Sequence, residues 1–136
     1  MHVTKNTGFL GRWQQLREYP KVFCDTGHNK EGLTYVMNQI SKENFKRLHI
    51  VFGVVNDKGI STIVDVLPKT AIYYFCKPNI PRGLDAQTLK ERMHKYGLYG
   101  KAYSSVNKAY EGALSSAKQD DFIFIGGSTF VVAEII

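Results

Sequence analysis

From residue 20 onward, short apolar runs alternate with stretches whose apolar residues recur at the helical period. A chain that alternates strands with helices is built for a parallel sheet covered by helices. The predicted strands are the runs at residues 21–25, 48–55, 71–77, 101–105 and 121–127. Three of them are apolar almost throughout, as strands buried on both faces are. The alternation therefore predicts an α/β fold with a mostly parallel sheet.

Helical periodicity fills the gaps between these runs. Apolar residues repeat at i, i+3, i+4 and i+7 in residues 33–40 and again in residues 60–67. A third helix is predicted over Leu89, Met93 and Tyr96, and a fourth covers residues 106–114. Side chains suited to helix N-caps precede these last two: Asp85, and then Ser105 or Asn107.

The two ends of the chain are less regular. Residues 128–136 read as a final helix, although their β-branched content leaves a strand open. The segment GRWQQLREY, residues 11–19, lies outside the alternation and is interpreted as an edge strand added to the sheet. No linker or repeat interrupts the chain, so residues 1–136 are predicted to form one domain.

Composition and charge narrow the function classes. The chain is 43% hydrophobic with two cysteines, which excludes collagen-like, disordered and disulfide-scaffold proteins. Its net charge of +6 is spread evenly over both halves, with no arginine-rich tail, so the charge fits a small anionic substrate as well as a polynucleotide. No nucleic-acid partner is predicted. No run reaches the roughly 20 apolar residues of a membrane span. Cys24 and Cys76 lie in apolar runs, as buried reduced thiols do, so a cytoplasmic location is expected.

The carboxyl ends of parallel strands are where such sheets bind ligands. After the first predicted strand, the segment CDTGHNKEG carries Asp25, His28 and Asn29. Asp25 can accept hydrogen bonds from a ribose, and His28 and Asn29 can face phosphates or an incoming nucleophile. Helix capping is the alternative for Asp25 and Asn29, and a structural role is the alternative for His28.

Three later strand ends offer further candidates. Asp57 and Lys58 follow the second strand, and helix capping is the favoured interpretation of Asp57. Arg82 lies in the two-proline loop KPNIPRGLD, where its planar fork suits a carboxylate or a phosphate. Ser128 and Thr129 follow a glycine pair and suit an anion, with an ordinary N-cap as the alternative.

Several catalytic signatures are missing from the sequence. It contains no GxxxxGK[ST] phosphate loop, GxGxxG, HExxH, CxxC or GxSxG motif. His2, His28, His49 and His94 are scattered without cysteine or carboxylate partners at metal-ligand spacing, so no metal site is predicted.

The ordered series GRW, DTGHNKEG, HIVFGVVNDK, PNIPRGLD and IFIGGSTFVVAEI is similar to the C-terminal, glutamate ligase domain of bifunctional folylpolyglutamate synthase/dihydrofolate synthase. That family belongs to the Mur ligase superfamily, which joins an amino acid to a carboxylate through an acyl phosphate made from ATP. The resemblance covers nearly the whole chain. It implies a Rossmann-like three-layer domain and a cytoplasmic, ATP-dependent amide-forming ligase.

The resemblance also implies residue roles. Arg12, Asp25 and Asn29 would bind ATP, with the arginine at its phosphates and the aspartate at its ribose. His28 would be catalytic and, together with Arg82 and Ser128, would contact glutamate or the other substrate. This sequence departs from the family's common DGAHNPEG pattern at residues 26, 27 and 30, where it has Thr, Gly and Lys.

The rest of the machinery is expected elsewhere. In the family, the phosphate loop, the magnesium ligands and most of the folate site lie in a larger N-terminal ATPase domain. The chain is therefore interpreted as one domain of a two-domain enzyme that uses ATP, Mg²⁺, L-glutamate and dihydropteroate or folate. Alone it is expected to be inactive. Three alternatives stay open: the C-terminal domain of a muramyl peptide ligase, a stand-alone module that binds nucleotide or nucleic acid, and a single domain used only for interaction.

Overall fold

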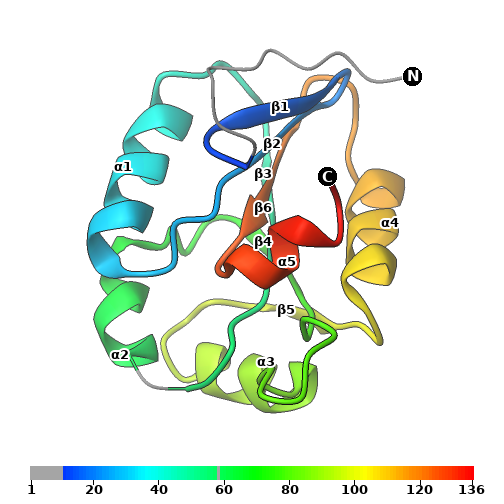
Figure 1. The fold of residues 1–136 in the computed structure, drawn as a ribbon. Coiled ribbons are helices and arrows are strands. Elements are labelled where there is room, and N and C mark those ends of the chain that lie inside the picture. Colours follow the sequence, from blue (N-terminus) through cyan, green and yellow to red (C-terminus); the bar gives the residue numbers. More distant parts are fainter. Residues whose placement is uncertain (1–10, 58) are drawn as a thin grey trace.

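The computed structural model describes residues 11–57 and 59–136 and has one six-stranded sheet, in the order β1-β2-β6-β3-β4-β5 (Figure 1). Every strand except β1 runs parallel to its neighbours: β2 (Lys21–Cys24), β3 (Leu48–Phe52), β4 (Ile72–Phe75), β5 (Gly100–Ala102) and β6 (Phe122–Gly126). At the other edge, β1 (Gln14–Glu18) pairs antiparallel with β2. The predicted parallel sheet and the predicted edge strand are both confirmed, with shorter bounds.

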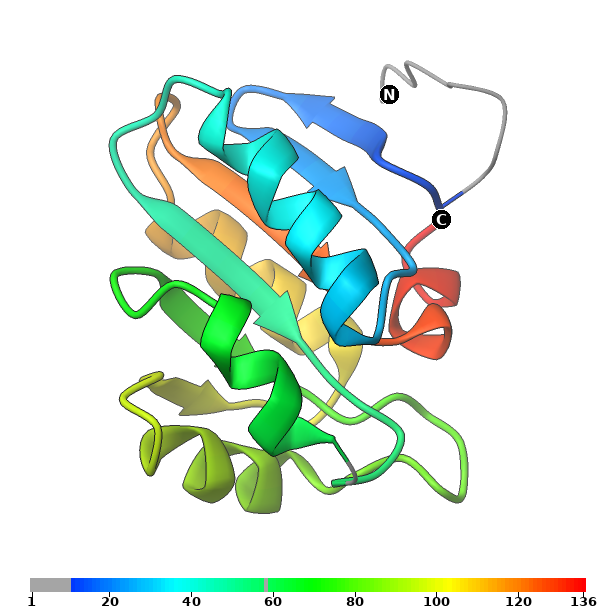
Figure 2. The ribbon, with the colours of Figure 1, turned by 90° about the vertical axis from the view of Figure 1, so that its left-hand side faces the viewer.

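Helices cover both faces of the sheet. One face carries α1 (Lys30–Ser41), α2 (Ile60–Ile63) with the 3₁₀ turn η1 (Val64–Val66), and α3 (Ala86–His94). The opposite face carries α4 (Val106–Ser116) and α5 (Thr129–Ala133). Figure 2 shows α1 and α2 in front of the sheet and α4 behind it. The chain is thus a three-layer α/β domain.

Successive side chains of a strand point to opposite faces of the sheet, so each strand contributes to two hydrophobic cores, one under each helix layer. In β6, Phe122 and Phe124 belong to the core on the side of α1, whereas Ile123 and Ile125 belong to the core on the side of α4 and α5. All four side chains are fully buried. A strand whose two faces are both covered needs apolar residues at every position, which is why this run was recognisable in the sequence.

The helix predicted over residues 60–67 is confirmed only in its first half. The α-helical part ends at Ile63, and the chain continues as the 3₁₀ turn η1. Pro68 follows, and a residue before proline is disfavoured in the helical region. Leu67 accordingly adopts an extended backbone with φ −91° and ψ 133°.

The third predicted helix also stops early, because Tyr96 lies beyond its end. Asp85 caps the N-terminus of α3 as expected, accepting a hydrogen bond from the Thr88 amide. The helix ends at His94, and Gly97 takes a left-handed backbone with φ +80°. Leu98 N then bonds back to Met93 O at 3.1 Å, a glycine-terminated helix end. Ser105, rather than Asn107, caps α4.

A buried polar network closes the amino ends of the strands. His49 on β3 lies 2.8 Å from Tyr74 Oη through Nδ1 and 2.8 Å from Asp121 Oδ2 through Nε2. Asp121 Oδ2 also accepts the Lys118 amide at 3.1 Å. Burial alone raises the pKa of Asp121, but hydrogen bonds from His49 and Lys118 and the charges of His49 and Arg47 outweigh burial and lower it.

Both cysteines are buried and unpaired, as the sequence predicts. Burial, reinforced by Asp25, raises the pKa of Cys24 to about 12, and burial with Glu134 does the same for Cys76. Thiols with such pKa values are inert at neutral pH. Across the described residues, no helix is long and apolar enough to cross a membrane.

Candidate functional site

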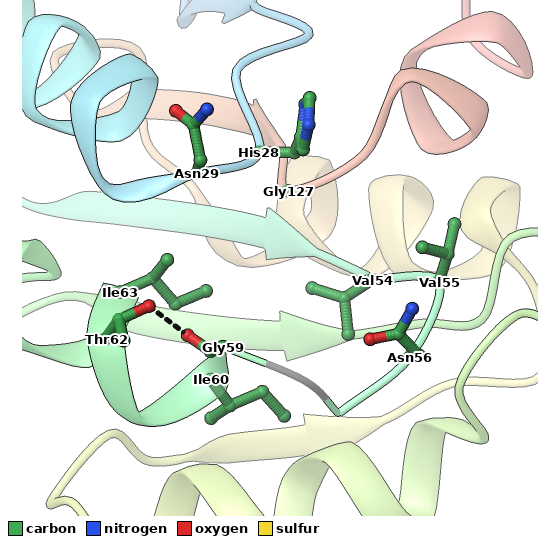
Figure 3. Close-up of a pocket in the computed structure, with 10 residues that line it drawn as sticks. All are labelled: His28, Asn29, Val54, Val55, Asn56, Gly59, Ile60, Thr62, Ile63 and Gly127. Atoms are coloured by element: carbon green, nitrogen blue, oxygen red, sulfur yellow. Dashed lines mark hydrogen bonds between the residues drawn. The ribbon is translucent and has the colours of Figure 1, made fainter.

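Two adjoining cavities lie where the carboxyl ends of β2, β3, β4 and β6 meet. A cavity of about 270 Å³ lies between the loop before α1 and the segment from β3 to α2 (Figure 3). A second, of about 190 Å³, lies between Arg82 and the start of α5. His28, Val55 and Gly127 line both cavities. We call the two together the exit groove.

Asp25, directly after β2, organises the turn that leads to α1. Its Oδ1 accepts the Gly27 amide at 2.7 Å, and its Oδ2 accepts the Trp13 amide at 2.8 Å. Only 3% of Asp25 is exposed, and it lines neither cavity. In this conformation the carboxylate therefore holds the turn together by pairing with two backbone amides.

The segment before β1 is fastened to this turn, which places Arg12 beside it. The Thr26 amide donates to Gly11 O at 2.8 Å, and the Trp13 amide donates to Asp25. Trp13 has a left-handed backbone with φ +45°, which is unfavourable for a bulky residue. Its ring stacks on Phe23 with centroids 4.5 Å apart, and this packing together with the bond to Asp25 offsets the strain. Arg12 sits between the two fastened residues and is exposed.

His28 and Asn29 follow the turn and line the larger cavity. Asn29 Oδ1 accepts the Gly32 amide at 2.8 Å, so the capping interpretation of Asn29 is confirmed. The side-chain NH₂ group of Asn29 takes no part in that cap. His28 is exposed, with Nδ1 3.4 Å from Thr26 O. Figure 3 shows both side chains across the cavity from Asn56 and Thr62.

The glycine pair after β6 forms the floor of the exit groove. Gly127 has φ +99°, and a Cβ there would lie 2.5 Å from Gly53 O and 2.8 Å from the Phe52 ring. Only glycine fits this backbone at this distance. Ser128 follows, is 3% exposed, and accepts the Phe130 amide at 3.0 Å, so it caps α5 as the alternative interpretation expected. Its hydroxyl proton can still be donated.

The loop between β4 and α3 brings Arg82 to the second cavity. Leu84 N donates to Val54 O at 2.9 Å, which ties the end of the loop to the end of β3. The Arg82 guanidinium carbon lies 5.4 Å from the centre of the Phe130 ring. Arg82 is exposed, so its outer edge is accessible to an anion.

The predicted cap at Asp57 is wrong. Gly59 occupies the N-cap position of α2, two residues later, and no side chain caps that helix. Asp57 instead pairs with Arg92 of α3 at 2.5 Å. Lys58 lies outside the described residues. Thr129 lines the second cavity as the first residue of α5.

The structure therefore brings four of the six predicted site residues into one groove. Those four are His28, Asn29, Arg82 and Ser128. Arg12 and Asp25 lie together at the neighbouring turn. Asn56, Thr62 and Phe130 also line the groove and were not predicted. Asn56 comes directly after the strand predicted at residues 48–55, and that position was the available signal for it.

No group of three or more metal-ligating side chains occurs in residues 11–57 and 59–136. The exposed polar side chains at the groove are one imidazole, two amides, two hydroxyls and one guanidinium, from His28, Asn29, Asn56, Thr62, Thr129 and Arg82. Such groups suit the binding of anions and the transfer of protons.

Comparisons with known proteins identify the family and support the fold. The family model "Mur ligase, glutamate ligase domain" matches residues 11–129. The Escherichia coli protein "Dihydrofolate synthase/folylpolyglutamate synthase" is 31% identical over 130 residues, which cover 93% of this chain and 29% of that protein. A Haloferax volcanii protein, "Probable bifunctional folylpolyglutamate synthase/dihydropteroate synthase", is 31% identical over 133 residues, covering 96% of this chain and 16% of the relative.

Solved structures show the same fold. The structure "E.coli FolC in complex with DHPP and ADP" superposes with a TM-score of 0.82 at 28% identity, covering 93% of this chain and 30% of that one. A Yersinia pestis bifunctional folylpolyglutamate synthase/dihydrofolate synthase gives a TM-score of 0.82 at 23% identity, which supports the fold alone. The chain spans less than a third of the length of each of these proteins.

Proposed function

The chain belongs to the Mur ligase glutamate ligase domain family, and from this we propose that it is the C-terminal domain of an ATP-dependent ligase that joins L-glutamate to dihydropteroate or to a folate. The observation that carries the proposal is the convergence of His28, Arg82 and Ser128 on one groove within the matched residues. The names of the E. coli and Haloferax relatives, and the ADP and DHPP in the E. coli structure, support the substrate classes.

The proposed reaction has two steps. A carboxylate of dihydropteroate or folate attacks the γ-phosphorus of ATP, which forms an acyl phosphate and releases ADP. The amine of glutamate then attacks the acyl carbon, forming the amide bond as phosphate leaves and the nitrogen loses a proton. Charge develops on the phosphoryl oxygens and on the acyl oxygen, where fixed donors are most effective.

The groove residues are suited to the second step. His28 is exposed and, as a neutral imidazole, can accept the proton that the attacking amine loses. Arg82 can pair with a glutamate carboxylate through its planar fork, and the Ser128 hydroxyl can donate to the same substrate. Holding glutamate beside the acyl phosphate removes orientational freedom from the reaction.

The turn beside the groove is the proposed ATP contact. Arg12 is exposed between two residues that are hydrogen-bonded to the turn, and this position places its guanidinium at the proposed phosphate site. Each carboxylate oxygen of Asp25 accepts one backbone bond and has capacity for a second, from a ribose hydroxyl. The NH₂ group of Asn29 can donate to a phosphate oxygen.

The remaining parts are assigned to the rest of the enzyme. The described residues offer no cluster of metal ligands, so we propose that the ligands of Mg²⁺ lie in an N-terminal ATPase domain. That domain would also bind most of the folate. The two inert, unpaired cysteines fit a reducing cytoplasm.

ADP release tests the proposal. The chain is mixed with ATP, Mg²⁺, L-glutamate and dihydropteroate, first alone and then joined to the N-terminal domain of its parent enzyme. We expect glutamate-dependent release of ADP from the joined form only. A joined form that stays inactive with dihydropteroate and folate contradicts the proposal, and activity with a muramyl peptide instead assigns the chain to that branch of the superfamily.

A further inference from the structure

We infer that Phe130 and Glu134 of the α5 segment are positioning residues that hold Arg82 in the exit groove and so set the affinity for the acidic co-substrate. Neither residue has an assigned role. The positioning itself is a property of this chain, whereas its consequence for glutamate rests on the proposed function. The two parts are tested by separate measurements.

The loop that carries Arg82, residues 77–85, contains no helix or strand. Two internal backbone bonds shape it, from Ile80 N to Pro78 O at 2.8 Å and from Gly83 N to Ile80 O at 3.0 Å, and contacts with other elements place it in the groove. Leu84 N donates to Val54 O at 2.9 Å, which anchors the end of the loop to the segment just after β3. Asn79 N donates to Glu134 Oε2 at 2.7 Å, which anchors its beginning to the end of α5. Arg82 therefore lies between two anchors, one of which is a single side chain.

Phe130 supplies a third contact at Arg82 itself. The guanidinium carbon lies 5.4 Å from the ring centre, within the roughly 6 Å over which an aromatic face attracts a cation. Phe130 and Glu134 are four residues apart at the helix, so their side chains lie on one side of it. The loop thus rests on one side of α5 through a carboxylate–amide bond and a cation–ring contact.

This arrangement suits the recognition of a carboxylate. A ring on one face of a guanidinium leaves the N–H groups at its edge free to form two parallel bonds to a carboxylate. The same cavity is lined by His28 and Ser128, so Arg82 is held on the wall that the proposed glutamate would face. A long arginine fixed in place loses less freedom on binding than one that moves freely in solvent.

NMR of the 136-residue chain tests the positioning directly. The Arg82 Nε–H signal, assigned by its loss in Arg82→Lys, is expected to be displaced by the ring current of Phe130. Phe130→Leu should remove that displacement and Phe130→Tyr should keep it. Tyr35→Leu, which removes a 52% exposed ring on α1, is the matched control and should leave the signal unchanged. A signal that does not respond to Phe130→Leu overturns the inference.

Kinetics of the joined enzyme test the consequence. Phe130→Leu and Glu134→Ala should each raise the KM for glutamate about two- to fivefold, with kcat and the KM for ATP unchanged. Two conservative variants should keep the wild-type KM. They are Phe130→Tyr, which keeps the ring, and Glu134→Gln, whose side-chain oxygen can still accept the Asn79 amide. An unchanged KM for glutamate in both damaging variants contradicts the role. If the wild-type joined enzyme is inactive, the proposed function and the glutamate role fail, and the NMR result alone decides the positioning.

Discussion

The amino ends and the carboxyl ends of the parallel strands carry similar polar side chains, which are buried at one end of the sheet and exposed at the other. At the amino ends of the strands, His49, Asp121 and Tyr74 are buried and satisfied by one another. At the carboxyl ends, His28 and Arg82 are exposed and line a groove. A histidine with an acid nearby therefore does not by itself indicate a site. The difference lies in whether the side chains retain hydrogen-bonding capacity that a ligand can reach.

The largest expected effect comes from removing Asp121. Asp121→Ala leaves His49 Nε2 and the Lys118 amide without their acceptor inside the protein. Breaking a buried pair in this way should lower the free energy of unfolding by about 3 kcal/mol. Urea denaturation measures this. His28→Ala, the matched change at the carboxyl ends of the strands, should alter the free energy of unfolding by less than about 0.5 kcal/mol. Equal losses in the two variants would contradict the difference proposed between the two ends.

Gly127→Ala should follow in size. The substitution forces a Cβ against Gly53 O at 2.5 Å while the backbone keeps φ +99°, which should destabilise the fold by about 2 kcal/mol. Gly59→Ala is the control, because its φ is +80° but the nearest atom lies 3.5 Å away. Thermal unfolding of both variants separates the clash from the backbone strain. Equal shifts in Tm would mean that the groove floor is not tightly packed.

Asp25 tests whether burial or position decides the role of an acidic side chain, because it lies at the carboxyl ends of the strands but is buried like Asp121. Asp25→Asn keeps one acceptor oxygen and loses the other, so one of the amides of Trp13 and Gly27 loses its partner. The free energy of unfolding should fall by about 1 kcal/mol. Urea denaturation checks this value. No loss of stability would leave ligand binding as the sole role of this carboxylate.

The smallest effect is the response of stability to acid. The pKa of Asp121 is lowered from 3.8 in the folded protein, so the unfolded chain binds a proton more readily. The stability it contributes is complete above pH 3.8 and is lost as the pH falls through the lower, folded value. Unfolding free energies measured as a function of pH should show this loss in wild type and a shallower one in Asp121→Asn. Parallel curves would contradict the direction of the shift.

Much of the fold was predictable because burial on both faces of a strand forces continuous apolar runs. The five parallel strands and the helices α1, α3, α4 and α5 followed from this pattern and from cap residues such as Ser105. The misplaced boundaries have local causes. Pro68 shortens one predicted helix and Gly97 ends another. Both residues were visible in the sequence, but the helical spacing of the apolar residues was given more weight in predicting where the helices end.

The candidate site was predictable only as far as strand ends determine it. His28, Arg82 and Ser128 each follow a strand, and parallel strands bring such positions to one edge. The contacts of Phe130 and Glu134 with the Arg82 loop depend on how α5 packs against a segment far away in the sequence. The bonds to Asp25 depend likewise on β1 joining the sheet. No local pattern encodes either arrangement.

The most direct test of the exit groove as the reaction centre is glutamate-dependent ADP release by the joined enzyme with His28→Ala. The expected result is a loss of about a hundredfold or more in kcat, within the range for removing a general base, with an unchanged free energy of unfolding. The matched Tyr35→Ala variant should keep full activity. An enzyme that retains its rate without His28 would contradict the assignment of the exit groove as the reaction centre.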